Sequence, residues 1–115
     1  IANLETDFYL LGWGGPTYDA EYIFNFLYHS RNEGRGSWNG TQFSNPEMDE
    51  MIVSLSSETD LDVRNGTIAE LFAMSEEELI YLPIHNQILN WGISDAWSAM
   101  VDADDQVLFM YFELN

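Results

Sequence analysis

The chain contains no cysteine and no lysine, and its only basic residues are Arg31, Arg35 and Arg64. Without cysteine it has neither a disulfide nor a thiolate zinc site. Against the three arginines stand 20 Asp and Glu residues, which give a net charge of -17 over 115 residues. Three scattered cations cannot neutralise the phosphates of a nucleic acid, and an anionic membrane surface would repel the chain. The composition therefore excludes both of these classes of partner.

Long apolar runs are also missing, because no stretch approaches the roughly 20 residues that a membrane-spanning helix needs. The chain is nevertheless 46% hydrophobic and 15% aromatic, which is too apolar for a disordered acidic tail. We therefore expect one folded domain over residues 1–115. The sequence starts at Ile1 with no Met, no basic segment and no signal-peptide pattern. This start predicts a fragment of a longer protein, with any targeting signal outside it.

The hydrophobic pattern predicts both helices and strands. Apolar residues at helical spacing predict helices that begin near residues 19, 46 and 60. Continuous or alternating apolar runs predict strands over residues 7–12, 80–89 and 106–112. The order strand, helix, helix, helix, strand, strand favours an α/β or α+β fold over a helical bundle or a β-sandwich.

Capping residues support the helix starts. Asp19 is a candidate N-cap, and Asp60 opens the third helical pattern. Ser44 and Glu47 fit a capping box around Pro46, which is tolerated in a first turn. Spacing places the following apolar residues on one face of the first helix: Tyr22, Ile23, Phe26 and Leu27.

A glycine-rich turn, Gly12-Trp13-Gly14-Gly15-Pro16, follows the first predicted strand. Ligands of α/β sheets bind at the carboxyl ends of strands, where Trp13 would offer a flat apolar wall. Glycines there would allow a sharp bend or a close approach of backbone to a ligand. The alternative is a tight turn around a core Trp. The turn lacks the Lys and Ser/Thr of a phosphate-binding loop.

Other candidate sites have structural explanations. An acidic turn at Asp102, Asp104 and Asp105 cannot be a calcium loop, because Val107 takes the place of the required glycine. His29 and His85 lie on different predicted elements, without the spacing of a metal motif. We expect His29 to interact favourably with a helix C-terminus, and His85 to be a hydrogen-bonded strand histidine. No nucleophile motif such as GxSxG is present, so we expect no catalytic residue, metal or cofactor.

Several stretches together resemble the C-terminal part of the family 5 extracellular solute-binding proteins, the dipeptide, oligopeptide and nickel receptors of ABC importers. The similarity covers residues 7 to about 91 well and the tail from Trp97 weakly. The matching stretches, in family order, are Asp7-Phe-Tyr-Leu-Leu-Gly-Trp-Gly-Gly, Tyr18-Asp19, Trp38-Asn39, Phe43-Ser-Asn-Pro-Glu-Met-Asp49, Arg64 and Ile80-Tyr-Leu-Pro-Ile-His85.

The resemblance implies a fold and a function. The fold would be the C-terminal lobe of a class II periplasmic-binding-protein-like protein, with a mixed sheet flanked by helices. The function would be capture of peptides in the periplasm or outside the cell, with or without a lipid anchor, and delivery to a membrane permease. Its partners would be the solute, the missing N-terminal lobe and the permease. The implied ligand-binding residues are Trp13, Gly14, Gly15, Pro16, Tyr18, Asp19 and Trp38.

One departure from the family bears on the ligand. The peptide receptors hold the α-amino group of the peptide with an Asp three residues after the loop Trp, and this chain has Pro16 there. Asp19 or another acid would have to replace it. Some nickel receptors carry a Pro at this point, so a nickel-chelate or other small-solute receptor is an alternative. A protein interaction module and a hydrolase are the alternatives from other classes.

Overall fold

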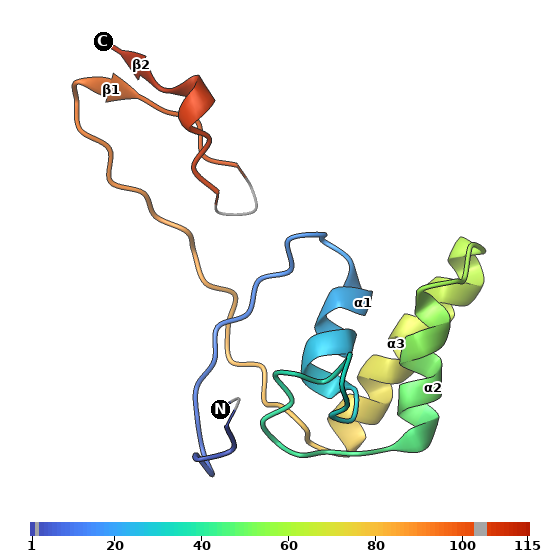
Figure 1. Ribbon diagram of the computed structural model, residues 1–115. Helices are drawn as coiled ribbons and strands as arrows, with labels where there is room; N and C mark the ends of the chain where they lie inside the picture. The colour runs from blue at the N-terminus through green and yellow to red at the C-terminus, as the bar shows by residue number, and fades with distance from the viewer. Residues whose placement is uncertain (2, 103–105) are drawn as a thin grey trace. The chain divides into compact units, whose positions relative to one another are not determined.

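The computed structural model describes residues 1, 3–102 and 106–115. It has two compact units, Ile1–Leu82 (the helical unit) and Pro83–Asn115 (the hairpin unit). Helices fill the first unit and a small antiparallel sheet lies in the second (Figure 1). This mixture of helix and sheet is α+β, the coarse class that the sequence predicts. The assignment of one domain to the whole chain stays a prediction.

The helical unit contains the three predicted helices. The first is α1 (Ala20–Ile23), which continues directly into the π-helix η1 (Phe24–Tyr28). The others are α2 (Pro46–Leu55) and α3 (Leu61–Glu77), which pack against each other (Figure 1). α2 also contacts η1.

Two of the predicted caps are confirmed and one is wrong. Oδ1 of Asp19 accepts a hydrogen bond from the backbone N–H of Glu21 at 2.8 Å, and Asp60 caps α3 in the same way. For α2 the cap is Asn45, whose Oδ1 accepts from the N–H of Glu47 at 3.0 Å. The hydroxyl of Ser44 instead accepts from the hydroxyl of Ser30 at 2.8 Å. The capping box fails because Asn45, one residue closer to the helix, is itself a strong N-cap residue.

The core lies between η1, α2 and α3. On α2, Met48, Ile52 and Leu55 are buried and lie on one face of the helix. On the first helix the predicted face is only partly right, because Phe24 is fully buried and Tyr22 is half-buried. The hydrogen bonds of η1 span five residues rather than four, which rotates the later side chains relative to an α-helical pattern. The buried apolar residues are Phe24, Leu27, Tyr28, Met48, Ile52, Leu55, Leu71 and Ile80.

The predicted strands over residues 7–12 and 80–89 do not form. Neither segment contains a helix or a strand among the described residues. In the first, the side chain of Phe8 is 94% exposed, so the apolar run does not lie in a buried sheet. A strand needs a neighbour for its backbone hydrogen bonds, and an apolar pattern cannot supply one.

The hairpin unit holds β1 (Trp97–Ser98) and β2 (Glu113–Leu114). They pair antiparallel, with Trp97 opposite Leu114, and a further bridge joins Val101 to Val107. The described residues therefore contain a two-stranded antiparallel sheet, and the expected mixed sheet is not present among them. The predicted strand over residues 106–112 is also wrong, because the 3-10 helix η2 (Phe109–Tyr111) interrupts it. Asp104 and Asp105 of the predicted acidic turn lie outside the described residues.

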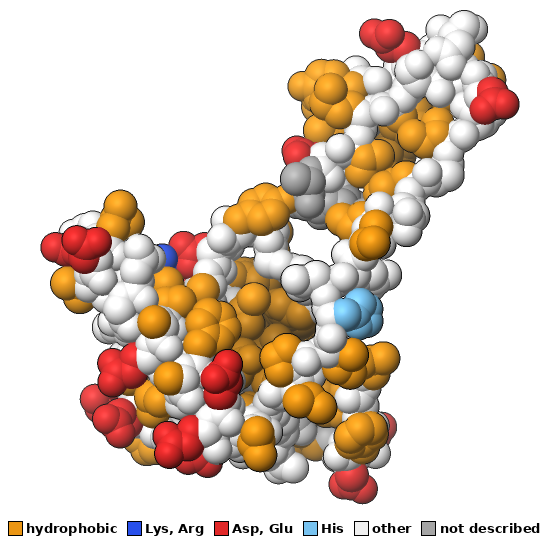
Figure 2. Space-filling model, turned by 180° about the vertical axis from the view of Figure 1, so that it is seen from behind, with side chains coloured by type: hydrophobic (Ala, Val, Ile, Leu, Met, Phe, Trp, Pro, Cys, Tyr) orange, Lys and Arg blue, Asp and Glu red, His pale blue; other side chains and the backbone are white. Residues whose placement is uncertain are grey.

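The hairpin unit has no buried residue among those that the structure describes. Figure 2 shows apolar side chains at the molecular surface, together with many acidic ones. The apolar residues of this unit with the largest exposed fractions are Ile88, Phe109, Met110 and Leu114. No helix in the described part of the chain is both long and apolar enough to cross a bilayer.

Candidate functional site

Two of the predicted ligand-binding residues meet in an aromatic cluster of the helical unit. The ring centroids of Trp13 and Trp38 lie 6.0 Å apart, in an edge-on arrangement. Tyr22 and Phe26 complete the group, at 6.0 Å and 6.2 Å from Trp13. We call these four residues the Trp13 cluster. Its members come from the glycine-rich turn, the first helix and the loop over residues 31–43, so the fold joins three separate stretches here.

The residues of the Trp13 cluster differ in their exposure to solvent. Trp38 is 40% exposed, whereas Trp13 is half-buried and packs against the apolar core. The indole Nε1–H of Trp13 is buried and has no hydrogen-bond partner among the described residues. A buried donor without a partner is uncommon and carries a desolvation cost. The cluster is therefore neither a purely apolar core contact nor a fully exposed wall.

The loop over residues 31–43 is held against η1 by its backbone. The N–H of Gly36 donates to the carbonyl of Asn25 at 2.8 Å, and that of Trp38 donates to the carbonyl of Phe26 at 3.0 Å. Gly36 has a φ of 65°, and a Cβ there would lie 2.3 Å from the carbonyl oxygen of His29. Only glycine fits this position. The sequence predicts conformationally special glycines in the turn after Leu11, but among the described residues the glycine with a positive φ is Gly36.

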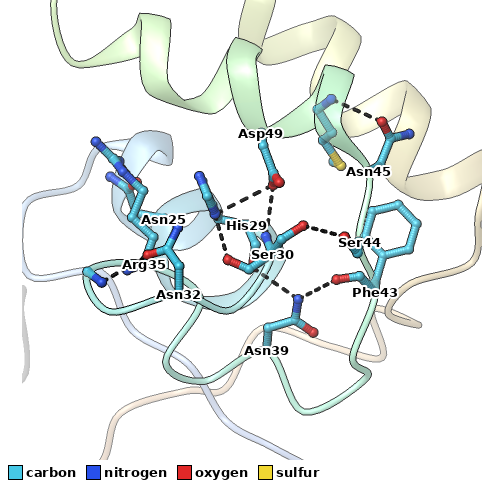
Figure 3. Close-up of polar contacts among 12 residues, drawn as sticks. Asn25, His29, Ser30, Asn32, Arg35, Asn39, Phe43, Ser44, Asn45 and Asp49 are labelled. Atoms are coloured by element: carbon cyan, nitrogen blue, oxygen red, sulfur yellow. Dashed lines mark hydrogen bonds and ion pairs between the residues drawn. The ribbon is translucent and has the colours of Figure 1, made fainter.

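Asn39 anchors the same loop from inside (Figure 3). It is fully buried, and its Nδ2 donates to the carbonyls of His29 at 3.0 Å and Phe43 at 2.8 Å. Its Oδ1 accepts from the hydroxyl of Thr41 at 2.9 Å. These three bonds close the loop on itself and fix the position of Trp38 at its centre.

Asp19 has internal partners. Its Oδ1 caps α1 and also accepts from Nη2 of Arg64 on α3, at 2.7 Å. The Arg64 guanidinium, helped by the N–H of Glu21, holds the pKa of Asp19 below its usual value. Arg64 also donates through Nε to the carbonyl of Leu55, at 3.3 Å. Asp19 and Arg64 thus tie the three helices together, and the carboxylate is already engaged where a ligand amine would need it.

The other predicted residues lie around the Trp13 cluster without joining it. Gly14 and Pro16 are exposed, and Gly15 lies beside the ring of Tyr22. Tyr18 is 70% exposed and has a φ of 53°, an uncommon conformation for a residue other than glycine. The turn therefore presents Tyr18 outward, next to the capped start of α1.

The two histidines occupy different environments. His29 is buried at the end of η1, where its Nδ1 lies 2.7 Å from the carbonyl of Ser30 and 3.5 Å from Oδ1 of Asp49 (Figure 3). His85 is exposed in a segment without strand, so the predicted strand setting is wrong. Among the described residues, no group of three or more His, Cys, Asp or Glu side chains could hold a metal ion.

A depression that the sequence does not predict lies next to the Trp13 cluster. It has a volume of about 440 Å³ and is lined by Glu21, Asn25, Phe26, Asn32, Gly34 and Arg35. Phe26 belongs to both the depression and the cluster. No sequence motif brings Arg35 to the first helix. That contact depends on the docked loop.

Comparisons with protein-family models, with curated proteins and with solved structures found no match to this chain.

Proposed function

We propose that this chain is part of the substrate-binding component of an ABC importer, a family 5 type receptor that captures di- or oligopeptides. It would act in the periplasm or outside the cell and deliver its solute to a membrane permease. The proposal assigns no catalytic residue and no cofactor. It rests on the ordered sequence resemblance over residues 7 to about 91, combined with the geometry of the helical unit.

The observation that carries the proposal is the ring contact between Trp13 and Trp38, at 6.0 Å. The resemblance implies that both residues line a ligand site, although they lie in different segments. Binding sites for small solutes commonly combine aromatic walls with a few polar groups. A joined aromatic pair with one exposed edge, beside a depression with polar lining, fits that description.

The finer fold assignment is also part of this proposal. The segments over residues 7–12 and 80–89 lack strand partners among the described residues. In the lobe of a two-lobed receptor, strands from the remainder of the protein would supply those partners. The C-terminal segment would be completed in the same way.

The test is a nuclear magnetic resonance titration of the labelled chain with a dipeptide, glycyl-phenylalanine. The four tryptophans give four indole N–H signals, and two of them belong to the hairpin unit. We expect weak binding, in the millimolar range, because one lobe supplies only part of the contacts. The indole signals of Trp13 and Trp38 should shift, whereas those of Trp91 and Trp97 should stay in place.

Two variants make the titration specific. Trp13→Ala should abolish the shift at Trp38, and Trp97→Ala, the matched control, should leave it unchanged. A nickel(II)–histidine chelate serves as the second probe, because the described residues offer no metal site and nickel would have to arrive with its own ligands. A response to the chelate alone would favour the nickel-receptor alternative. Equal shifts at all four indoles, or no shift with either probe, would contradict the proposal.

A second candidate function, a protein interaction module, is favoured by the exposed apolar residues of the hairpin unit. Phe109 and Met110 are each 79% exposed and lie next to each other on η2. Contiguous exposed apolar patches mark interaction surfaces. The unit carries acidic residues and no Lys or Arg, so a partner with a basic rim fits it better than a second, equally acidic copy.

Sedimentation velocity separates these partners. An amphipathic peptide of Leu and Lys should bind the chain, and a matched peptide of Leu and Glu should not. Phe109→Ser combined with Met110→Ser should weaken the binding, whereas Val53→Ser, an exposed apolar site on α2, should not. Concentration-dependent dimerisation without any peptide would instead identify a second copy as the partner.

A further inference from the structure

The depression beside the Trp13 cluster has groups of opposite charge on either side of one amide. Asn25 donates through Nδ2 to Oε1 of Glu21 at 2.6 Å, and its Oδ1 accepts from Nη1 of Arg35. The amide therefore points its donor at the carboxylate and its acceptor at the guanidinium. Glu21 and Arg35 form no ion pair with each other in the described part of the chain.

Arg35 is held in place by the loop rather than by a carboxylate. Oδ1 of Asn32 accepts from the backbone N–H groups of Gly34 at 2.9 Å and Arg35 at 2.8 Å (Figure 3). The next residue, Gly36, is bonded to the carbonyl of Asn25 at 2.8 Å. Half-buried, the guanidinium uses one of its N–H groups on Asn25. In a chain with 20 acids and three arginines, it is unexpected that the Arg35 guanidinium forms no ion pair with a carboxylate in the described part of the chain.

The charges of this depression select one class of ligand. A simple anion would meet the carboxylate of Glu21, and a simple cation would meet the guanidinium of Arg35. A molecule with one charge of each sign, separated by a short polar link, matches both. We propose that the depression between Glu21 and Arg35 binds the α-ammonium and carboxylate groups of an amino acid or dipeptide.

Each part of such a ligand has a counterpart in the site. The ligand carboxylate accepts hydrogen bonds from Arg35, whose planar fork suits a carboxylate. Its ammonium group donates to Glu21, and an apolar side chain packs on the ring of Phe26. In this arrangement Glu21 supplies the carboxylate that holds the ligand amine. It replaces the Asp that the peptide receptors carry where this chain has Pro16. For dipeptides the inference rests on the proposed function and adds the groups that fix the ligand's ends.

The experiment uses four probes on the 115-residue chain: glycyl-phenylalanine, its N-acetyl form, its C-terminal amide and free phenylalanine. The readouts are the Nε–H signal of Arg35 and the side-chain amide of Asn25 in a resonance titration. Blocking either charge should weaken binding about tenfold, the size expected for a lost charge-assisted hydrogen bond at a partly exposed site. Equal binding by the dipeptide and free phenylalanine identifies the amino-acid moiety as the ligand, and tighter binding by the dipeptide identifies the peptide.

Charge-neutral variants assign each end. Arg35→Gln should remove the preference for the free carboxylate over the amide, and Glu21→Gln should remove the preference for the free ammonium over the acetylated form. Arg31→Gln and Glu50→Gln make the same charge changes on exposed residues outside the depression and should keep both preferences. Arg35→Lys keeps the charge and should restore part of the carboxylate preference, which a folding defect would not do.

The outcomes separate this inference from the proposed function. Shifts at Trp13 without shifts at Arg35 and Asn25 would overturn the inference and leave the receptor proposal in place. Shifts at Arg35 and Asn25 alone would support the inference and contradict the proposal that the Trp13 cluster binds the ligand. Equal affinities for the zwitterion and its blocked forms, or no response to any probe, would overturn the inference.

Discussion

The buried amide of Asn39 allows a direct test of the loop that carries Trp38 and Arg35. Asn39→Ala leaves the carbonyls of His29 and Phe43 without their donor, at the ends of bonds of 3.0 Å and 2.8 Å. A buried polar group left without a partner costs about 1–3 kcal/mol. The contact to His29 is buried and that to Phe43 only partly so. We therefore expect a total loss of about 2–4 kcal/mol in the free energy of unfolding.

The chain contains its own control, because the tripeptide Asn-Gly-Thr occurs twice, at Asn39 and at Asn65. Asn65 is exposed on α3, so Asn65→Ala should change stability by less than about 0.5 kcal/mol. Asn39→Asp should cost more than Asn39→Ala, because a carboxylate would face two carbonyl oxygens. Thr41→Val removes one hydrogen bond of 2.9 Å and should cost about 1 kcal/mol.

The assay is urea unfolding followed by far-ultraviolet circular dichroism, with the four variants measured beside the parent chain. The Thr41 variant keeps the test informative if Asn39→Ala does not fold. Equal unfolding midpoints for Asn39→Ala and Asn65→Ala would refute the reasoning, because the buried bonds would then contribute nothing beyond what water supplies.

Three further predictions concern the backbone, pH and salt. Gly36→Ala should destabilise the chain by about 2 kcal/mol or more, which is the cost of a strained backbone position. Gly66→Ala should stabilise the chain by about 0.5–1 kcal/mol, because Gly66 lies within α3 and a Cβ there meets open space. Thermal unfolding of both variants measures these changes. Burial raises the pKa of Tyr81 above its usual value, so its stabilising contribution is complete below pH ~10 and is lost as the pH rises further. Tyr81→Phe should reduce this alkaline loss in urea midpoints measured from neutral to high pH, and an unchanged slope would count against it. Salt should raise the stability of a chain with a charge of -17, and equal midpoints in dilute buffer and molar salt would show that self-repulsion is unimportant.

The sequence predicted those parts of the fold that local chemistry decides. Asp19 and Asp60 cap helices because each lies directly before a helical apolar pattern and its side-chain oxygen reaches the free N–H groups of the first turn. The strands were not predictable in the same way. The apolar run around Phe8 forms no strand and no described segment pairs with it, because pairing depends on a partner that the run itself does not encode.

In the candidate site, too, some features were predictable from the sequence and others depend on contacts that form only on folding. The approach of Trp13 and Trp38 agrees with their joint assignment from the resemblance, while their role in binding stays a prediction. The anchoring role of Asn39 and the position of Arg35 were not predicted, because both depend on contacts between the loop and η1. A buried Asn and an exposed Asn in identical tripeptides cannot be told apart before the chain is folded.

The attachment of the loop to η1 has a consequence for how this region opens. The N–H groups of Gly36 and Trp38 donate hydrogen bonds to carbonyls of η1. The same helix carries Phe24, a fully buried residue of the core. Exposing these two amides to hydrogen exchange therefore requires the helix end and the loop to separate, which is costlier than the fraying of an ordinary loop. Irregular backbone here behaves as part of the core. A solute that touches Trp38 meets a surface arranged before it arrives, and little conformational entropy is lost in ordering that surface on binding.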